Sequence, residues 1–251
     1  MDFDQITPLP QESTREFVYR FLKANIMHLR MPPGTPLTEQ DIATLLSVSR
    51  TPVREAFIQL SQEHLLDILP QKGTYVSLID LDSVEESKFM RETLEKSVIK
   101  IACRQFPAER LFELQSCISI QELCLQENNY LKFYELDEQL HRTIFSGCKK
   151  ERIWDAIQQM NTHYNRVRLL NLASSSDFNE LLQQHKNLVQ AIRDQDATLG
   201  GKTIALHLNK VRVDLIELSQ EYPAYFLQPP KKMPQKFSQV IASRTNKLPN
   251  K

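Results

Sequence analysis

Residues 37–60 read LTEQDIATLLSVSRTPVREAFIQL and indicate two short amphipathic helices joined by a linker of about Ser47-Val48-Ser49. Thr38 precedes the first helix and Ser49 the second, and both residue types cap helix N-termini. Pro52 falls in the first turn of the second helix, where its missing N–H is tolerated. Apolar residues recur at helical spacing in both segments, at Ile42, Leu45, Leu46, Ala56, Phe57 and Leu60. This pattern predicts a helix-turn-helix.

The flanking residues extend this unit to about residues 10–77. Ser13 and Glu16 have capping-box spacing, and they open a helix whose expected buried stripe is Val18, Leu22, Ile26 and Leu29. Pro32-Pro33-Gly34 ends that helix. Residues 66–69 and 74–77 read as short strands around Pro70-Gln71-Lys72-Gly73, where Gly73 suits a strained backbone position. Three helices followed by a hairpin predict a winged helix-turn-helix.

The rest of the chain predicts a second, all-helical domain over residues 82–222. Ser83 and Glu86 repeat the capping-box spacing, and the glycine count of five leaves few sharp turns. About six amphipathic helices are expected, at 83–105, 108–127, 130–147, 151–172, 177–195 and 198–220. The fold class is therefore mostly α, a winged helix-turn-helix plus an antiparallel helical bundle. Residues 227–251 carry six basic and no acidic residues, and we expect a disordered tail.

Charge and composition exclude some classes of protein and leave DNA binding open. Lys and Arg number 31 and balance 31 Asp and Glu, so no global basic charge signals nucleic acid. The N-terminus lacks the apolar core of a signal peptide, and no run is long enough to span a membrane. We therefore expect a soluble cytoplasmic protein, with Cys103, Cys117, Cys124 and Cys148 as reduced core thiols.

The start of the second short helix carries the residues expected to touch DNA. In a helix-turn-helix, the N-terminal residues of the second helix reach base edges and phosphates in the major groove. Arg50 and Arg54 are four residues apart and so share a face, and a guanidinium can bind guanine in bidentate fashion. Ser49 and Thr51 adjoin them, and Thr51 can donate to phosphate. Lys72 at the hairpin tip can follow the DNA backbone or enter the minor groove.

The residues from Leu37 to Leu60, followed by HLL and PQKGTYV, resemble the DNA-binding domain of the GntR family. The stretch VSRTPVREA is close to that family's signature, and the resemblance covers about residues 14–77. It implies DNA contacts by Arg50, Thr51, Arg54, Lys72 and Gly73, with Arg30 and Glu39 near the interface. Ser47 and His64 stand where the family usually has glycines, which affects loop geometry but removes no contact residue.

Four polar residues lie on the apolar stripes of three predicted helices in the second domain. Asp137 and His141 are one turn apart beside Phe133, Leu140 and Ile144. His185 shares a stripe with Leu181, Leu188 and Ile192, and His207 with Ile204, Val211 and Leu215. Each would need a partner on burial, and a shared divalent ion would satisfy all four. The alternative is that each histidine is separately hydrogen-bonded in the core or at the surface.

An Asp-x-x-x-His helix followed by single histidines on the last two helices resembles the FCD ligand-binding domain of the FadR-like branch of the same family. This likeness covers about residues 82–222 and implies a metal bound by Asp137, His141, His185 and His207. Zinc, nickel and manganese all suit such a mixed set of ligands. In such domains a carboxylate metabolite commonly completes the coordination with help from an arginine, and the candidates are Arg91, Arg166 and Arg168.

The sequence thus predicts a transcription regulator, expected to be a repressor, whose homodimer binds an inverted-repeat operator. A small carboxylate or sugar acid is the expected effector. A metal-dependent enzyme that uses the Asp and three His is the main alternative, but no general base, P-loop or dinucleotide motif accompanies that set. A helical adaptor without a ligand is the other alternative.

Overall fold

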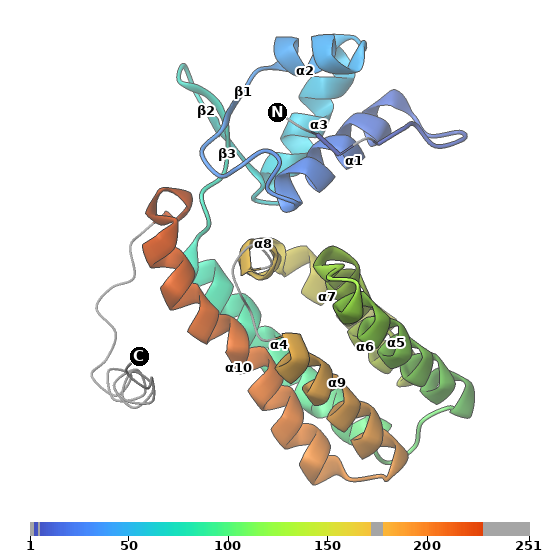
Figure 1. Ribbon diagram of the computed structural model, residues 1–251. Coiled ribbons are helices and arrows are strands. Elements are labelled where there is room, and N and C mark those ends of the chain that lie inside the picture. The colour runs from blue at the N-terminus through green and yellow to red at the C-terminus, as the bar shows by residue number, and fades with distance from the viewer. Residues whose placement is uncertain (1–2, 5, 172–177, 228–251) are drawn as a thin grey trace.

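The computed structural model describes residues 3–4, 6–171 and 178–227. Its N-terminal part contains α1 (Thr14–Met27), α2 (Glu39–Leu46) and α3 (Arg50–Gln62) with a small sheet. The strands are β1 (Pro36–Leu37), β2 (Leu66–Leu69) and β3 (Gly73–Val76), in the order β1-β3-β2 with both pairs antiparallel. This part lies at one end of the molecule, and its hairpin projects from it (Figure 1). It has the order of a winged helix-turn-helix.

The predicted N-cap hydrogen bonds are present at two of the three helices of this part. Ser13 and Glu16 form the reciprocal capping box of α1, and Thr38 accepts the Asp41 N–H at the start of α2. Ser49 occupies the N-cap of α3, but its side chain makes no cap hydrogen bond. Leu29 lies beyond the end of α1 and packs against a different cluster, so its assignment to the first helix was wrong.

The sheet has a strand that the sequence did not reveal. β1 is only two residues long and pairs Pro36 with Tyr75 and Leu37 with Thr74. Two residues are too few to show a periodic pattern. The β2–β3 loop is Pro70–Lys72, with Gly73 at a φ of 113° and Gln71 at 62°. Both values lie in the left-handed region, where glycine is favoured.

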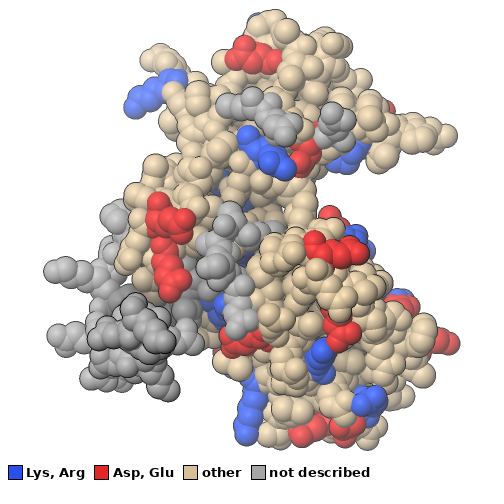
Figure 2. Space-filling view, viewed as in Figure 1, with Lys and Arg blue, Asp and Glu red and all other residues tan. Residues whose placement is uncertain are grey.

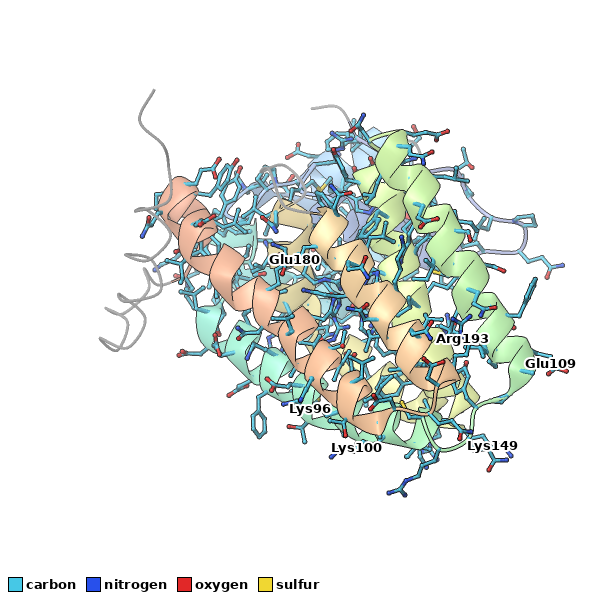
Figure 3. The ribbon with its side chains drawn as sticks, turned by 60° about the horizontal axis from the view of Figure 1, so that its bottom comes forward. Lys96, Lys100, Glu109, Lys149, Glu180 and Arg193 are labelled. Atoms are coloured by element: carbon cyan, nitrogen blue, oxygen red, sulfur yellow. The ribbon has the colours of Figure 1, made fainter. Side chains whose placement is uncertain are left out.

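The C-terminal part is an antiparallel bundle of long helices around a continuous apolar core. The elements are α4 (Leu81–Ala102), α5 (Ala108–Gln126), α6 (Tyr130–Gly147), α7 (Glu151–Met160), α8 (Thr162–Asn171), α9 (Phe178–Arg193), α10 (Ala197–Glu221) and a final turn, η1 (Pro223–Tyr225). α4 packs mainly on α10, whereas α5 packs on α6 and α9. Figure 3 shows α4, α10 and α9 side by side along the bundle.

Most helix ends differ from the sequence prediction by one to three residues, and two differences change the structure of the bundle. α4 begins at Leu81 with Asp80 as N-cap, and Ser83 donates its hydroxyl to Asp80 instead of capping. The helix expected at 151–172 is interrupted at the fully buried Asn161. The Met160 carbonyl, which the break frees, accepts the Ser87 hydroxyl from α4 at 2.7 Å. That tertiary contact satisfies a polar group that would otherwise be buried without a partner.

A third apolar cluster joins the two parts of the chain. It contains Ile79 from the connection after β3, Val84 from α4, and residues of α8, α10 and the final turn. Leu29 packs against it from the N-terminal part, and α8 also contacts α1. Figure 1 shows α8 directly beneath the N-terminal part. Helix α8 therefore contacts the N-terminal part directly.

The structure also bears on the cysteines, on membrane-spanning segments and on the C-terminal tail. The four cysteines are free thiols, and Cys148 is only partly buried. No helix among the described residues is long and apolar enough to cross a membrane. The tail expected to be disordered falls almost entirely on residues 228–251, which lie outside the described residues.

Candidate DNA interface and metal centre

Arg50 and Arg54 lie on the exposed face of α3, as the spacing predicted. Their side chains retain 57% and 62% of their full exposure. Glu39 at the start of α2 accepts a hydrogen bond from Arg50 at 3.0 Å and from Arg54 Nε at 2.9 Å. The two arginines lower the pKa of Glu39 although slight burial opposes them. The guanidinium groups are therefore aligned by one carboxylate and remain open to solvent.

The other proposed DNA-contacting residues are exposed as well. Ser49 and Thr51 border the start of α3, and Lys72 and Gly73 lie at the tip of the hairpin. Figure 2 shows positive charge at this tip. Arg30 is exposed after α1, and its Nε lies 3.3 Å from an Asp4 carboxylate oxygen. The N-terminal part thus has two separate sites of exposed positive charge, one formed by the arginines of α3 and one at the hairpin tip.

The two positions that depart from the family pattern adopt the backbone that glycine would favour. Ser47 has a φ of 55° and His64 a φ of 58°. Both lie in the left-handed region, which costs a residue with a Cβ about 1–2 kcal/mol. The turn of the helix-turn-helix and the entry to the hairpin therefore keep their expected geometry under local strain.

Asp137, His141, His185 and His207 converge in the core of the bundle. Their ligand atoms all lie within 4.8 Å of one another, and all four residues are buried. His185 Nε2 lies 2.9 Å from Asp137 Oδ1, and the Nε2 atoms of His141 and His207 lie 3.1 Å apart. Asp137 and His141 come from α6, His185 from α9 and His207 from α10. The sequence identified this set, and the fold brings it to one point.

The Nδ1 atoms of the three histidines each lie beside an oxygen acceptor, and this arrangement indicates what the Nε2 atoms can bind. His141 Nδ1 lies 2.6 Å from a Glu95 carboxylate oxygen. His185 Nδ1 lies 2.8 Å from Gln121 Oε1, and His207 Nδ1 lies 3.2 Å from Gln184 Oε1. An oxygen acceptor at each Nδ1 keeps the proton there and leaves Nε2 as a lone pair, as in metal-ligating histidines.

The Nε2 lone pairs lack a matching hydrogen-bond donor among the residues that the structure describes. His185 Nε2 is fully buried and finds no hydrogen-bond donor among the described residues. Two facing Nε2 lone pairs, on His141 and His207, would repel each other at their short separation unless a cation lay between the ligands. Three imidazoles and one carboxylate suit a divalent transition metal. The residues therefore fit a metal ion.

Electrostatics keep the candidate ligands in the form that a metal requires. Burial by itself would raise the pKa of Asp137, but Arg168 and the histidines hold it well below its usual value. Burial lowers the pKa of His185 and His207, so both rings are neutral at neutral pH. Metal ligands must be an ionised carboxylate and neutral imidazoles. Asp137, His185 and His207 are in these states.

A cavity with about 50 Å³ of accessible space adjoins this group and is partly open to solvent, so it can admit a carboxylate group while the rest of a larger acid extends outward. Asp137 and His207 line it together with Arg91, Arg168 and Tyr134. Arg168 pairs with Asp137 and Glu138 and lies over the Tyr134 ring at 4.6 Å. Arg91 Nε donates to Glu95 at 2.7 Å, and its two terminal nitrogens are buried without a hydrogen-bond partner among the described residues.

Two of the three predicted effector-binding arginines thus line the cavity, and the third does not. Arg166 is on the other side of α8 and donates to Ser77, so its placement in the effector site is not supported. Sequence reasoning also missed the residues that orient the histidines, namely Glu95, Gln121 and Gln184. Each is a polar residue buried on its helix. That signal was present in the stripes of α4, α5 and α9.

A winged helix-turn-helix joined to a helical domain with a buried polar cavity defines a DNA-binding regulator that senses a small molecule. Two family models support this class. The family described as "Bacterial regulatory proteins, gntR family" matches residues 14–76, and the FCD domain matches residues 88–210. The chain therefore belongs to the GntR family of bacterial transcription regulators and carries an FCD domain, which implies effector binding.

Individual relatives agree with this assignment. The chain is 29% identical to the HTH-type transcriptional repressor RspR of Escherichia coli over 217 residues, which cover 86% of this chain and 95% of RspR. The solved structure of E. coli McbR/YncC has the same fold, with a TM-score of 0.69 and 19% identity over 84% of this chain and 100% of that one. The matched GntR family is one of regulatory proteins and RspR is named a transcriptional repressor, and neither is described as an enzyme.

Proposed function

We propose that the protein is a metabolite-responsive repressor that acts in the cytoplasm as a homodimer on an inverted-repeat operator. Residues 10–77 would bind DNA and residues 82–222 would bind effector and metal. The repressor assignment is supported by the likeness to RspR, which is named a repressor. The dimer follows from the small surface that one recognition helix buries, because two-fold symmetry doubles the contacts with DNA.

Within this function, the bundle holds a single divalent ion at Asp137, His141, His185 and His207. The observation that carries this proposal is the set of three Nε2 atoms aimed at one carboxylate, each with its Nδ1 beside an oxygen acceptor. Zinc, nickel or manganese suits this set. When bound there, such an ion would supply a positive charge that attracts an anionic effector.

The effector is a small organic or sugar acid that occupies the cavity beside this group. Arg168 pairs directly with two carboxylates, whereas the buried terminal nitrogens of Arg91 make no hydrogen bond to the described residues, although one of them lies 3.6 Å from a Glu138 oxygen. A buried donor without a partner costs about 1–3 kcal/mol, so an incoming carboxylate would be stabilised there. A guanidinium matches a carboxylate in bidentate geometry. Arg91 and Arg168 are therefore the proposed recognition residues.

Metal content and unfolding test the metal proposal. Elemental analysis of purified protein should find about one transition ion per chain. EDTA should lower the thermal midpoint of the native protein but not that of His185→Ala. His64→Asn is the matched control, because His64 is an exposed histidine outside the site. No metal after reconstitution, together with unchanged stability in His185→Ala, would refute the site.

The effector and operator are tested by DNA binding. In a mobility-shift titration, the native protein should bind a DNA fragment from the promoter of its own operon, and this binding should weaken as salt is added. Citrate, gluconate or glucuronate should change the affinity for this DNA only when metal is present. His207→Ala should lose the response and keep basal DNA binding. Sedimentation should give a dimer. A response that persists without metal would remove the metal from effector recognition.

A further inference from the structure

Helix α8 presents different residues to the cavity and to the connection between the two parts of the chain. The residues that line the cavity are one turn or two apart on α8, at Tyr164, Val167, Arg168 and Asn171. His163 and Arg166 lie on another face and contact the connection after β3. The same short helix therefore touches the effector site and the chain that leads to the hairpin.

Arg166 makes an unusual contact for a buried arginine. It is fully buried, and its terminal nitrogens donate to Ser77 Oγ at 3.0 Å and to the Ser77 carbonyl at 2.7 Å. No carboxylate of the described residues lies within ion-pair distance, and burial, which outweighs the attraction of the more distant Asp67, lowers the pKa of Arg166 to about 10. A buried charge without a direct ion-pair partner costs more than an apolar side chain of the same volume. Packing alone therefore gives no reason for an arginine at this position.

Ser77 is the residue that closes the base of the hairpin. Its N–H donates to the Leu65 carbonyl at 3.0 Å, and its hydroxyl donates to the His64 carbonyl at 2.6 Å. It follows β3 directly, whereas His64 and Leu65 precede β2. Arg166 thus holds the residue that connects both ends of the hairpin.

The connection is also fixed on its other side. Ile79 N–H donates to the Tyr225 carbonyl at 2.7 Å, and the Ile79 carbonyl accepts from Leu227 at 2.9 Å. The Asp80 N–H faces His163 Nδ1 at 3.3 Å. The connection therefore lies between α8 and the residues after α10, and a shift of α8 cannot be absorbed by a free linker.

We infer that Arg166 is a positioning residue that couples helix α8 to the base of the hairpin, so that a change at the cavity face of α8 alters the placement of the hairpin on DNA. The coupling element is α8, which touches both sites directly. The effector part of this inference rests on the proposed function, but the mechanical link between Arg168 and Ser77 does not.

Hydrogen exchange of the full chain, in EDTA and without DNA, tests the link. Arg168→Met perturbs the cavity face of α8, and in the native background it should change exchange in residues 64–80 by about 2- to 30-fold. In an Arg166→Gln background the same substitution should change that exchange no further. Arg166→Lys keeps a donor for the Ser77 carbonyl and should restore part of the response.

Controls separate this coupling from general loosening. Arg193→Gln replaces an exposed arginine at the outer end of α9 and should leave the response to Arg168→Met intact (Figure 3). Should Arg168→Met fail to fold, Val167→Ala perturbs the same face. An equal change in both backgrounds, or no change in residues 64–80 in the native background, would overturn the inference.

A second measurement distinguishes this inference from the metal proposal. Adding Zn²⁺ should slow exchange in α6 and α9 in every background, but should reach residues 64–80 only when Arg166 is present. No effect in α6 and α9 would count against the metal centre and would leave the Arg168→Met comparison to decide on Arg166. A Zn²⁺ effect on residues 64–80 in Arg166→Gln would overturn the coupling role.

Discussion

Replacing Gln121 with methionine tests whether the hydrogen bonds behind the histidines set metal affinity. Gln121 is fully buried on α5, and its Oε1 is the acceptor 2.8 Å from His185 Nδ1. Methionine has similar length but no oxygen, so the ring loses the contact that fixes its tautomer. Loss of such a partner weakens metal binding about 10- to 100-fold, or about 1.4–2.7 kcal/mol.

The effect on stability follows from mass action. At a metal concentration about 100 times the native Kd, the ion stabilises the native protein by about 2.7 kcal/mol, and Gln121→Met by about 0.4–1.4 kcal/mol. Gln184→Met should lose less affinity, because its oxygen lies 3.2 Å from His207 Nδ1. Gln121→Glu keeps an acceptor and should bind at least as tightly as the native protein.

The assay is a competition titration against a chromogenic chelator, followed by urea unfolding with and without metal. We expect metal affinity to decrease in the order Gln121→Glu, native protein, Gln184→Met, Gln121→Met. Native affinity in Gln121→Met, alongside lost binding in His185→Ala, would show that the Nδ1 partners do not prepare the histidines.

Three further predictions concern the backbone, the DNA interface and pH. Ser47→Gly and His64→Gly should each raise the free energy of unfolding by about 0.5–1 kcal/mol, because each residue has a left-handed φ; a lower urea midpoint would contradict this. Arg50→Ala and Arg54→Ala should each weaken operator binding by about 1–3 kcal/mol and relax base preference. Arg15→Ala, which changes an exposed arginine outside α3, should do neither. If the two α3 variants lost the same affinity for unrelated DNA as for the operator, base reading by these arginines would be excluded. Burial, reinforced by the charge of Arg166, lowers the pKa of His163 to about 4 from 6.5, so its contribution to stability is complete above pH 6.5 and is lost as pH falls toward 4. Between pH 7.5 and 5 this loss is about 2 kcal/mol, and His163→Gln, which keeps an acceptor for the Asp80 N–H, should remove that part of the slope.

The elements predicted correctly were those fixed by neighbouring residues. The capping box at Ser13 and Glu16 and the cap at Thr38 depend on contacts three residues apart. At the break at Asn161, the Met160 carbonyl accepts a hydrogen bond from Ser87, which lies 73 residues away in the sequence. Such contacts leave no local pattern in the sequence.

The candidate metal ligands could be predicted because each lies on an apolar helical stripe. Their partners could have been found in the same way, since Glu95 follows Arg91 by one turn on the buried face of α4. For the two arginines of α8, the sequence could have excluded one of the predicted roles. Residues two apart lie on nearly opposite sides of a helix, so Arg166 and Arg168 could not both have faced one cavity. Which of them does so required the fold.

The contact between Glu39 and the two arginines of α3 has a consequence for the ionic-strength dependence of DNA binding. A carboxylate that stays beside Arg50 and Arg54 leaves the three groups with one net positive charge instead of two. Fewer counterions then leave the DNA than the number of arginine contacts suggests. In a plot of log K against log salt concentration, the slope would be shallower by about 0.9 than two unpaired arginines would give. The protein would thus hold its operator across a wider range of salt, at the expense of weaker attraction to bulk DNA.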